Sequence, residues 1–251
     1  MVTTGFGIDF GGSGIKGAYV DLAAGDFDGE RVRVPTPQPA TPAAVAEAVV
    51  ELLDGFPDRT GPVGITVPGI VHHGVVGSAA NIDPGWLGAD ADALFTEATG
   101  HEVHIVNDAD AAGLAEARYG AAKGRDGLVI VTTLGTGIGS ALVYDGALVP
   151  NSELGHLELD GRNAEQYAAN SAREREELSY EEWAKRLTAY YRMLEALFSP
   201  DLIVVGGGIS KKADRFLHLI DVGTEMVPAT LRNRAGIVGA ALWAAEAAAR
   251  H

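Results

Sequence analysis

The stretch "GIDFGGSGIKGAYVD", residues 7–21, holds two short apolar runs separated by Gly11-Gly12-Ser13-Gly14. Two residues are enough to connect the strands of a tight hairpin. The longer glycine-rich turn can direct its backbone N–H groups outward, which creates a concavity suited to an anion. Asp9 before the turn suits a hydrated Mg²⁺, and Lys16 after it suits phosphate. The stretch therefore predicts a phosphate-binding turn between two strands.

A second glycine-rich turn, "LGTGIG" at residues 134–139, resembles the first. Aligning residues 10–21 with 134–145 places Gly11 over Gly135 and Asp21 over Asp145. The offset of 124 residues is close to half of the 251-residue chain. Two related α/β halves would explain this echo, and chance similarity between two glycine-rich hairpins is the alternative.

A third turn, "VVGGGIS" at residues 204–210, predicts a strand, three glycines and a helix that starts near Ser210. The start of a helix after glycines suits a phosphate or an adenine-bearing ligand. None of the three turns is a Walker A motif, and a strand follows the first turn where a dinucleotide-binding motif needs a helix. Together the three turns predict that the protein binds a phosphate donor.

Composition and charge narrow the class of protein. Hydrophobic residues make up 47% of the chain, which allows one large domain or two ordinary ones. The chain lacks cysteine, a basic leader and an apolar run of membrane-spanning length, so we expect a cytoplasmic protein without disulfides or contact with a membrane. The net charge of −15 argues against nucleic-acid binding, and an anionic substrate would need a local basic site.

Strand and helix signals alternate along the chain, which predicts an α/β fold with a mostly parallel sheet. The predicted strands are 5–10, 17–22, 31–35, 63–67, 103–107, 128–133, 139–144 and 202–205. The predicted helices are a first one from Thr41 to just before Gly55, and three more at about 109–119, 179–198 and 236–250. The third helix opens with a capping box at Ser179 and Glu182. Its apolar stripe predicts a side that faces the core, with a dimer interface as the alternative; the stripe is Trp183, Leu187, Tyr190, Leu194 and Leu197.

Candidate groups for chemistry lie outside the turns as well. Asn107 and Asp108 end a buried strand, where α/β sheets bind ligands. Asp108 is a candidate general base, and a helix N-cap is the equal alternative. Asn81 and Trp86 lie in "SAANIDPGW", and a polar segment after the second turn supplies Glu153, His156, Glu158 and Glu165. Hydrogen bonds to sugar hydroxyls are the preferred use of this segment. Metal binding and a solvated loop are the alternatives.

The motifs "GIDFGGSGIKGA", "NDADAA", "LGTGIGSAL", "ELGH" and "VVGGGIS", in this order, resemble the ROK family of sugar kinases. The segments "SAANIDPGW", "EEWAKRL" and "LFSPDLIVVGGGISKKAD" resemble the members that phosphorylate glucose with inorganic polyphosphate and usually also with ATP. The resemblance covers essentially the whole chain. It implies an actin-like (ribonuclease H-like) fold of two lobes with the active site in the cleft between them. The expected small lobe is 1–110 with the helix 236–251, and the expected large lobe is 111–235.

The resemblance also implies roles for individual residues. Asp108 matches the catalytic base, and Asn81, Asn107, Asp108, Glu153, His156 and Glu165 match the sugar site. Glu165 is preferred to Glu158 because "AEQYA" resembles a family segment. The residues that match the phosphate and nucleotide motifs are Asp9, Gly11, Gly12, Ser13, Gly14, Lys16, Gly135, Thr136, Gly137, Gly206, Gly207 and Gly208.

The resemblance also implies where the metal ion and the phosphate donor bind. We expect Mg²⁺ near Asp9, held through water, and a polyphosphate track at Lys211, Lys212 and Arg215, for which a solvated helix start is the alternative. Many ROK proteins carry a zinc-binding cysteine cluster after "ELGH"; this chain has no cysteine, so zinc is not expected. A homodimer is the family expectation. A strictly ATP-dependent hexokinase and a non-catalytic sugar-binding protein are the alternatives in function.

Overall fold

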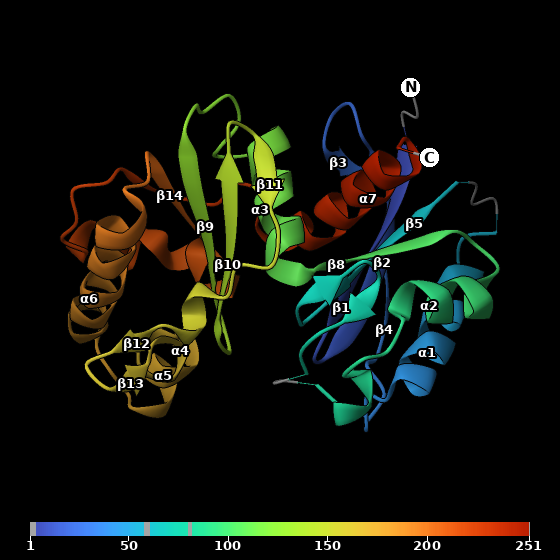
Figure 1. The fold of residues 1–251 in the computed structure, drawn as a ribbon, viewed down its shortest axis with the longest axis horizontal. Coiled ribbons are helices and arrows are strands. Elements are labelled where there is room, and N and C mark those ends of the chain that lie inside the picture. The colour runs from blue at the N-terminus through green and yellow to red at the C-terminus, as the bar shows by residue number, and fades with distance from the viewer. Residues whose placement is uncertain (1–3, 58–60, 80–81, 251) are drawn as a thin grey trace. The chain divides into compact units, whose positions relative to one another are not determined.

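The computed structural model describes residues 4–57, 61–79 and 82–250. The chain forms two compact units: unit 1 comprises Met1–Ala115 with Arg234–His251, and unit 2 comprises Glu116–Asn233. Figure 1 shows that each unit is built around its own β-sheet with helices packed on it. The fold is therefore of the predicted α/β class. The lobe ranges expected from the sequence stay a prediction.

The sheet of unit 1 has the strand order β3-β2-β1-β5-β8, and β4 pairs with β2. β1 and β2 form the predicted antiparallel hairpin around the first glycine turn, and β1, β5 and β8 run parallel. The strands are β1 (Thr4–Gly11), β2 (Gly14–Asp21), β3 (Asp26–Phe27), β4 (Val32–Val34), β5 (Val63–Val67) and β8 (Val103–Asn107). The last two agree with the sequence prediction residue for residue.

Two helices pack together beside one face of this sheet, and the C-terminal helix covers the other (Figure 1). α1 (Pro42–Asp54) is capped by the Thr41 side chain with proline at its first position, as predicted, and α2 (Ala91–Thr99) is capped by Asp90. Between them in the chain lie β6 (Val71–His72), β7 (Val75–Val76) and the 3-10 helix η1 (Pro84–Trp86). Trp86 is fully buried and donates its indole N–H to the Ala40 carbonyl at 2.8 Å, so it serves the core of unit 1.

The C-terminal helix α7 (Ala235–Ala248) packs unusually closely on the sheet. A Cβ atom at Gly7 of β1 would overlap the carbonyl oxygen of Ile237, and one at Gly64 of β5 would overlap that of Ala240. Glycine therefore allows backbone-to-backbone packing at these two strand positions. The contact fixes the first turn of α7 next to the carboxyl end of β1.

The sheet of unit 2 repeats the strand order of unit 1 as β11-β10-β9-β14-β15. An antiparallel hairpin, β9–β10, surrounds the second glycine turn, and β9, β14 and β15 run parallel. The strands are β9 (Leu128–Leu134), β10 (Ile138–Tyr144), β11 (Ala147–Val149), β14 (Leu202–Gly206) and β15 (Met226–Pro228). The echo between residues 10–21 and 134–145 is thus a repeat of topology as well as of sequence.

Helix α6 (Tyr180–Phe198) packs its apolar stripe on one face of this sheet, and its capping box is present as predicted. Four of the five predicted stripe residues are fully buried, but Leu197 is 59% exposed, so the stripe ends one turn earlier than predicted. Helix α3 (Asp108–Tyr119) begins in unit 1 and ends in unit 2. The remaining helices are η2 (Leu154–His156), α4 (Ala164–Ala168), α5 (Asn170–Arg175), η3 (Gly208–Arg215), η4 (Leu217–Leu219) and η5 (Arg232–Arg234), beside the short hairpin β12 (Glu158–Leu159) and β13 (Arg162–Asn163). None of the described helices combines the length and apolar character needed to cross a bilayer.

Candidate active site

The first glycine turn connects β1 and β2, and Asp9 and Lys16 face each other across the hairpin. Lys16 Nζ lies 3.1 Å from Asp9 Oδ2, and both side chains are 26% exposed. The Thr66 hydroxyl of the neighbouring β5 donates to Asp9 Oδ1 at 3.3 Å and accepts the Phe10 backbone N–H at 3.1 Å. Asp9 is therefore held by one cation and one hydroxyl at the carboxyl ends of two parallel strands.

Two residues that the sequence analysis did not single out donate hydrogen bonds to carbonyl oxygens of this turn. Thr36 donates its hydroxyl to the Gly11 carbonyl at 2.5 Å, and Arg33 Nη2 donates to the Ser13 carbonyl at 2.6 Å. No side-chain motif in the sequence marks this contact, because it depends on the pairing of β4 with β2.

Asn107 and Asp108 lie at the carboxyl end of β8, on the same sheet edge as Asp9 and Thr66. The Asn107 side chain is buried; its Oδ1 accepts the backbone N–H groups of Ala109 and Asp110 at 2.9 and 3.0 Å, and its Nδ2 donates to the Gly69 carbonyl at 3.0 Å. Asn107 therefore caps α3. The Asp108 side chain is exposed, and its Oδ1 accepts the N–H of the next residue at 2.9 Å. The alternative role of Asp108 as the helix N-cap is thus filled by Asn107.

The carbonyl oxygens of the second turn also accept hydrogen bonds from outside the turn. The backbone N–H of Ser171, on α5, donates to the Gly135 carbonyl at 3.1 Å, and the Ser171 hydroxyl donates to the Thr136 carbonyl at 2.5 Å. Ser171 was also missed by sequence reasoning, because its link to the turn spans 35 residues. Glu165 Oε2 accepts the Ile138 N–H at 3.4 Å, and a side chain at Gly137 would overlap this carboxylate. The second turn therefore lies directly beside a predicted sugar-binding residue.

The predicted sugar residues of unit 2 form one cluster. His156 Nε2 lies 3.5 Å from Glu153 Oε2, and His156 Nδ1 lies 3.9 Å from Glu165 Oε1. Partial burial raises the pKa of Glu153; the nearby His156 opposes this rise in pKa, and Glu165 adds to it. Glu158 is exposed on β12 and is not brought into this cluster. Asn81 lies outside the described residues.

The third turn follows β14, and Gly206 is paired with Thr133 of β9, so the third turn adjoins the second. Gly207 has a φ of +81°, and a side chain there would meet the Leu134 backbone. The predicted helix after this turn is instead the 3-10 helix η3, with Lys212 in a non-helical conformation. A short, kinked 3-10 segment has a poorer hydrogen-bond ladder than an α-helix. The segment after the third turn is therefore not the expected α-helix, and the nucleotide role of Gly206, Gly207 and Gly208 stays a prediction.

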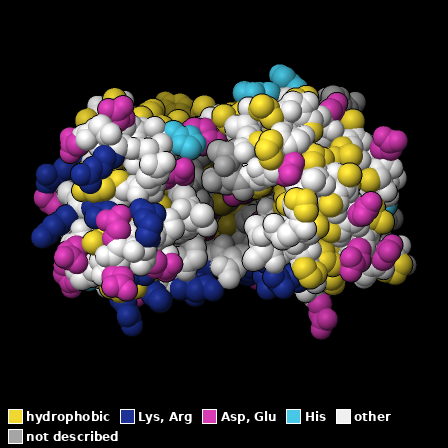
Figure 2. Space-filling view, turned by 90° about the horizontal axis from the view of Figure 1, so that it is seen from below, with side chains coloured by type: hydrophobic (Ala, Val, Ile, Leu, Met, Phe, Trp, Pro, Cys, Tyr) yellow, Lys and Arg dark blue, Asp and Glu magenta, His cyan; other side chains and the backbone are white. Residues whose placement is uncertain are grey.

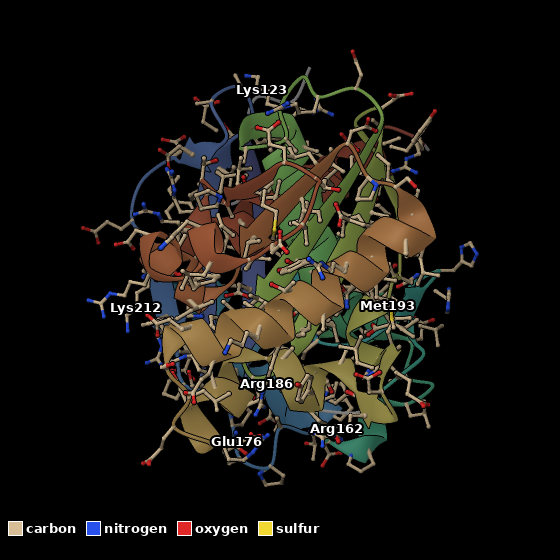
Figure 3. All side chains as sticks on the ribbon, turned by 90° about the vertical axis from the view of Figure 1, so that its left-hand side faces the viewer. Lys123, Arg162, Glu176, Arg186, Met193 and Lys212 are labelled. Atoms are coloured by element: carbon tan, nitrogen blue, oxygen red, sulfur yellow. The ribbon has the colours of Figure 1, made fainter. Side chains whose placement is uncertain are left out.

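Lys211, Lys212 and Arg215 are exposed on η3, and Figure 3 shows Lys212 at the edge of the molecule. The Arg215 guanidinium lies 5.9 Å from the Tyr180 ring centroid, which Arg173 approaches to 4.9 Å. Figure 2 shows further Lys and Arg side chains gathered over unit 2. Several arginines there are paired: Arg175 and Arg186 both contact Glu176, at 3.1 and 2.6 Å.

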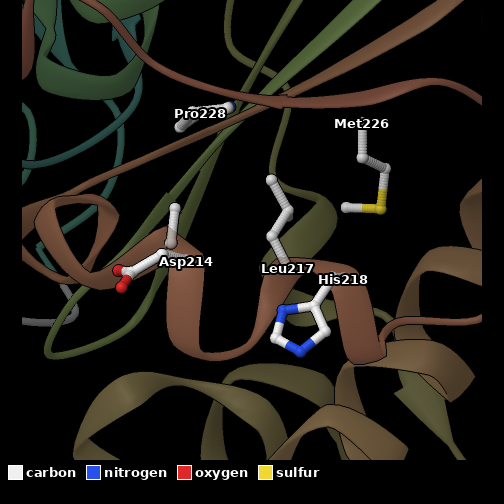
Figure 4. Close-up of a pocket in the computed structure, with 6 residues that line it drawn as sticks. Asp214, Leu217, His218, Met226 and Pro228 are labelled. Atoms are coloured by element: carbon white, nitrogen blue, oxygen red, sulfur yellow. The ribbon is translucent and has the colours of Figure 1, made fainter.

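An open hollow of about 460 Å³ lies behind η3. Figure 4 shows Asp214, Leu217 and His218 on one side of it and Met226 and Pro228 of β15 on the other. The walls are largely apolar, and Asp214 and His218 are their polar groups.

Metal ligands are sparse. Within the part of the chain that the structure describes, no group of three or more acidic, histidine or cysteine side chains could enclose a metal ion. Mg²⁺ usually needs only one or two carboxylates when phosphates supply its other ligands. The Asp9 carboxylate, beside a phosphate-type turn, fits that more limited role.

Two α/β units with the same strand order, each with a glycine-rich hairpin, are the architecture expected of an actin-like sugar kinase. The model of the ROK family matches residues 5–172, and the chain belongs to the ROK family. It is 54% identical to polyphosphate glucokinase of Mycobacterium tuberculosis over 239 residues, which cover 95% of this chain and 90% of the relative.

Solved structures agree with this assignment. Inorganic polyphosphate/ATP-glucomannokinase from Arthrobacter sp. strain KM is 56% identical, with a TM-score of 0.93 over 99% of this chain and 100% of that one. A ROK family glucokinase from Streptomyces griseus, in complex with glucose and AMPPNP, is 25% identical, with a TM-score of 0.82 over 97% of this chain and 99% of that one. The family and the actin-like α/β fold class predicted from the sequence are thus confirmed.

Proposed function

We propose that this chain is a glucokinase that transfers a phosphoryl group from inorganic polyphosphate or ATP to the 6-hydroxyl of glucose. The structural observation that carries the proposal is the exposed Asp108 at the carboxyl end of β8, on the same sheet edge as the first phosphate turn. The relatives support the choice of substrates, because polyphosphate glucokinase and polyphosphate/ATP-glucomannokinase are the names of proteins 54% and 56% identical to this chain.

In the proposed reaction, Asp108 accepts the proton of the sugar hydroxyl as that oxygen attacks the terminal phosphorus in line. A new P–O bond to the sugar forms while the bond from phosphorus to the bridging oxygen breaks. The products are glucose 6-phosphate and either ADP or a polyphosphate chain shorter by one unit. Catalysis of phosphoryl transfer is mostly positioning and charge stabilisation, so the residues are asked to supply one base and several fixed N–H donors beside a bound Mg²⁺.

The turns would provide those N–H donors. In each of the first two turns, two carbonyl oxygens already accept hydrogen bonds from outside the turn. A bound phosphate would therefore meet N–H groups with the opposing carbonyl dipoles already satisfied. Mg²⁺ would neutralise phosphate oxygens when bound, and Asp9 is the residue that would hold it.

The sugar would be held by fixed hydrogen bonds from Glu153, His156 and Glu165, which contact one another in unit 2. Asn107 keeps one amide hydrogen beyond the bond to Gly69, and Asn81 is the remaining expected contact. For the donor, exposed Lys211 and Lys212 suit the anionic chain, and the hollow beside η3 suits a nucleotide base. We further propose a homodimer in the cytoplasm; sedimentation of the purified protein tests the first and cell fractionation the second.

The deciding experiment is the formation of glucose 6-phosphate by purified protein with Mg²⁺ and either polyphosphate or ATP as sole donor. Turnover with polyphosphate supports the full proposal. Turnover with ATP but not with polyphosphate would indicate a strictly ATP-dependent ROK hexokinase and would contradict the proposed polyphosphate track. Glucose binding without turnover for either donor would indicate a non-catalytic sugar-binding protein.

A further inference from the structure

The first phosphate turn lies beside an arginine whose position depends on the sheet. The register of β4, β2 and β1 sets Arg33 opposite Lys16, and Lys16 opposite Asp9. Opposing residues of antiparallel strands point to the same face. Arg33, Lys16 and Asp9 therefore form a row on one face, and Thr66 extends the row through the parallel pairing of β1 with β5.

This row concentrates positive charge in an acidic part of the chain. Residues 1–115 hold four Lys and Arg against sixteen Asp and Glu, and two of those four cations stand side by side in the row. Asp9 pairs with Lys16. Among the described residues, no carboxylate lies within ion-pairing distance of Arg33. Like charges on directly opposite residues are unfavourable, so an anion that binds both cations would relieve the repulsion.

The contacts of Arg33 place its charge on the turn itself. Its Nη2 donates to the Ser13 carbonyl, and a side chain at position 14 would overlap the guanidinium, so Gly14 leaves room for it. At Gly12, by contrast, the space that a side chain would occupy has no atom within 4 Å. The turn is thus covered by Arg33 on one side and open at its tip.

We propose that Arg33 is a donor-binding residue that contacts the phosphate chain at the first turn and, together with Thr36, holds the turn's carbonyl oxygens away from that chain. The inference rests on the proposed function. The ligand chemistry is a linear phosphate chain, whose source is either polyphosphate or ATP. Arginine suits this role because its planar fork can hold a backbone carbonyl and a phosphate oxygen at the same time.

The test compares Arg33→Ala, Arg33→Lys and the matched control Arg31→Ala, which removes the same charge two residues away. Steady-state kinetics at saturating glucose use polyphosphate or ATP as donor. We expect Arg33→Ala to raise the donor KM about ten-fold, and Arg33→Lys about three-fold, since a charge-assisted hydrogen bond is lost or weakened. The glucose KM should stay within about two-fold of wild type, which also shows that the variants are folded. A rise in the KM for polyphosphate but not for ATP supports the proposal and identifies polyphosphate as the source of the phosphate chain that Arg33 contacts.

A binding measurement separates this inference from the proposed function. Calorimetric titration of the protein with tripolyphosphate, without glucose, should show about ten-fold weaker binding for Arg33→Ala and unchanged binding for Arg31→Ala. Equal losses in both variants would assign the effect to net charge and overturn the inference, as would unchanged binding in Arg33→Ala. If wild type forms no glucose 6-phosphate but its tripolyphosphate binding depends on Arg33, the proposed function fails and the inference stands.

Discussion

Asn107 caps the first turn of helix α3, because its Oδ1 accepts the backbone N–H of Asp110 at 3.0 Å. Asp108, the residue directly after Asn107, has an exposed side chain at the carboxyl end of β8. Burial of Asn107, together with its bond to the Gly69 carbonyl, fixes the chain at this point. A carboxylate on a rigid strand end is well placed to act on a bound substrate.

Replacing Asp108 with asparagine should lower kcat by about 10²–10⁴-fold, the usual contribution of a general base. The amide has nearly the same shape and cannot accept the proton, so glucose affinity should stay close to that of wild type. Kinetics with polyphosphate and ATP, and glucose titration by intrinsic tryptophan fluorescence, measure the two quantities. Glu97→Gln, at an exposed position of α2, is the control for loss of one negative charge. Near-normal turnover by folded Asp108→Asn protein would remove Asp108 from the mechanism.

Ser171 should matter for the donor although it lies on α5, away from any phosphate motif. Its hydroxyl donates to the Thr136 carbonyl at 2.5 Å, so Ser171→Ala leaves that carbonyl free to turn toward the donor. We expect kcat/KM for both donors to fall about ten-fold, the size of one lost hydrogen bond at a fixed dipole, with an unchanged glucose KM.

Ser179→Ala is a matched control for Ser171→Ala. Ser179 caps α6, and its loss should cost about 1 kcal/mol of stability without changing the kinetics. If Ser171→Ala changes only thermal stability, as this control does, Ser171 has a structural role alone.

Lys211 and Lys212 test the donor track. The double variant Lys211→Ala, Lys212→Ala should lower kcat/KM for long polyphosphate by about ten-fold or more and affect ATP little, because a long chain can reach more cations than a nucleotide. The double variant Lys123→Ala, Lys185→Ala removes the same charge from exposed positions elsewhere in unit 2. Equal losses with both donors would contradict a dedicated track.

The sequence predicted most of the fold because its signals are local. The Thr41 and Ser179 caps, the apolar strands and the glycine turns each depend on residues within a few positions of one another. The contacts that the sequence analysis missed join residues that are far apart in the sequence. Arg33 reaches the first turn through a strand 20 residues away, and Ser171 reaches the second across 35 residues. The helix expected at Ser210 became a kinked 3-10 segment, which the local pattern did not reveal.

Glu153 gives a prediction about pH. Burial raises the pKa of the Glu153 carboxyl in the folded state above its ordinary value in the unfolded chain. At a pH between these two pKa values, the carboxyl has lost its proton in the unfolded chain and still holds it in the folded protein. The folded state then binds more protons than the unfolded state, and stability must fall as the pH rises through the interval. Glu153→Gln cannot titrate and should avoid that loss. Its melting temperature relative to wild type should therefore be higher at pH 7 than at pH 4, by on the order of 1 °C.

Thermal melts of wild type and Glu153→Gln from pH 4 to pH 7 measure this difference, and glucose kinetics at pH 7 should show a raised KM, since the amide cannot accept a hydroxyl hydrogen bond as strongly as a carboxylate. Glu158→Gln removes the same charge from an exposed position on β12 and is the matched control. If both variants show the same change in melting temperature with pH, net charge is the cause. If Glu153→Gln gains no stability relative to wild type as the pH rises, the carboxyl does not carry the burial cost that its position beside His156 and Glu165 implies.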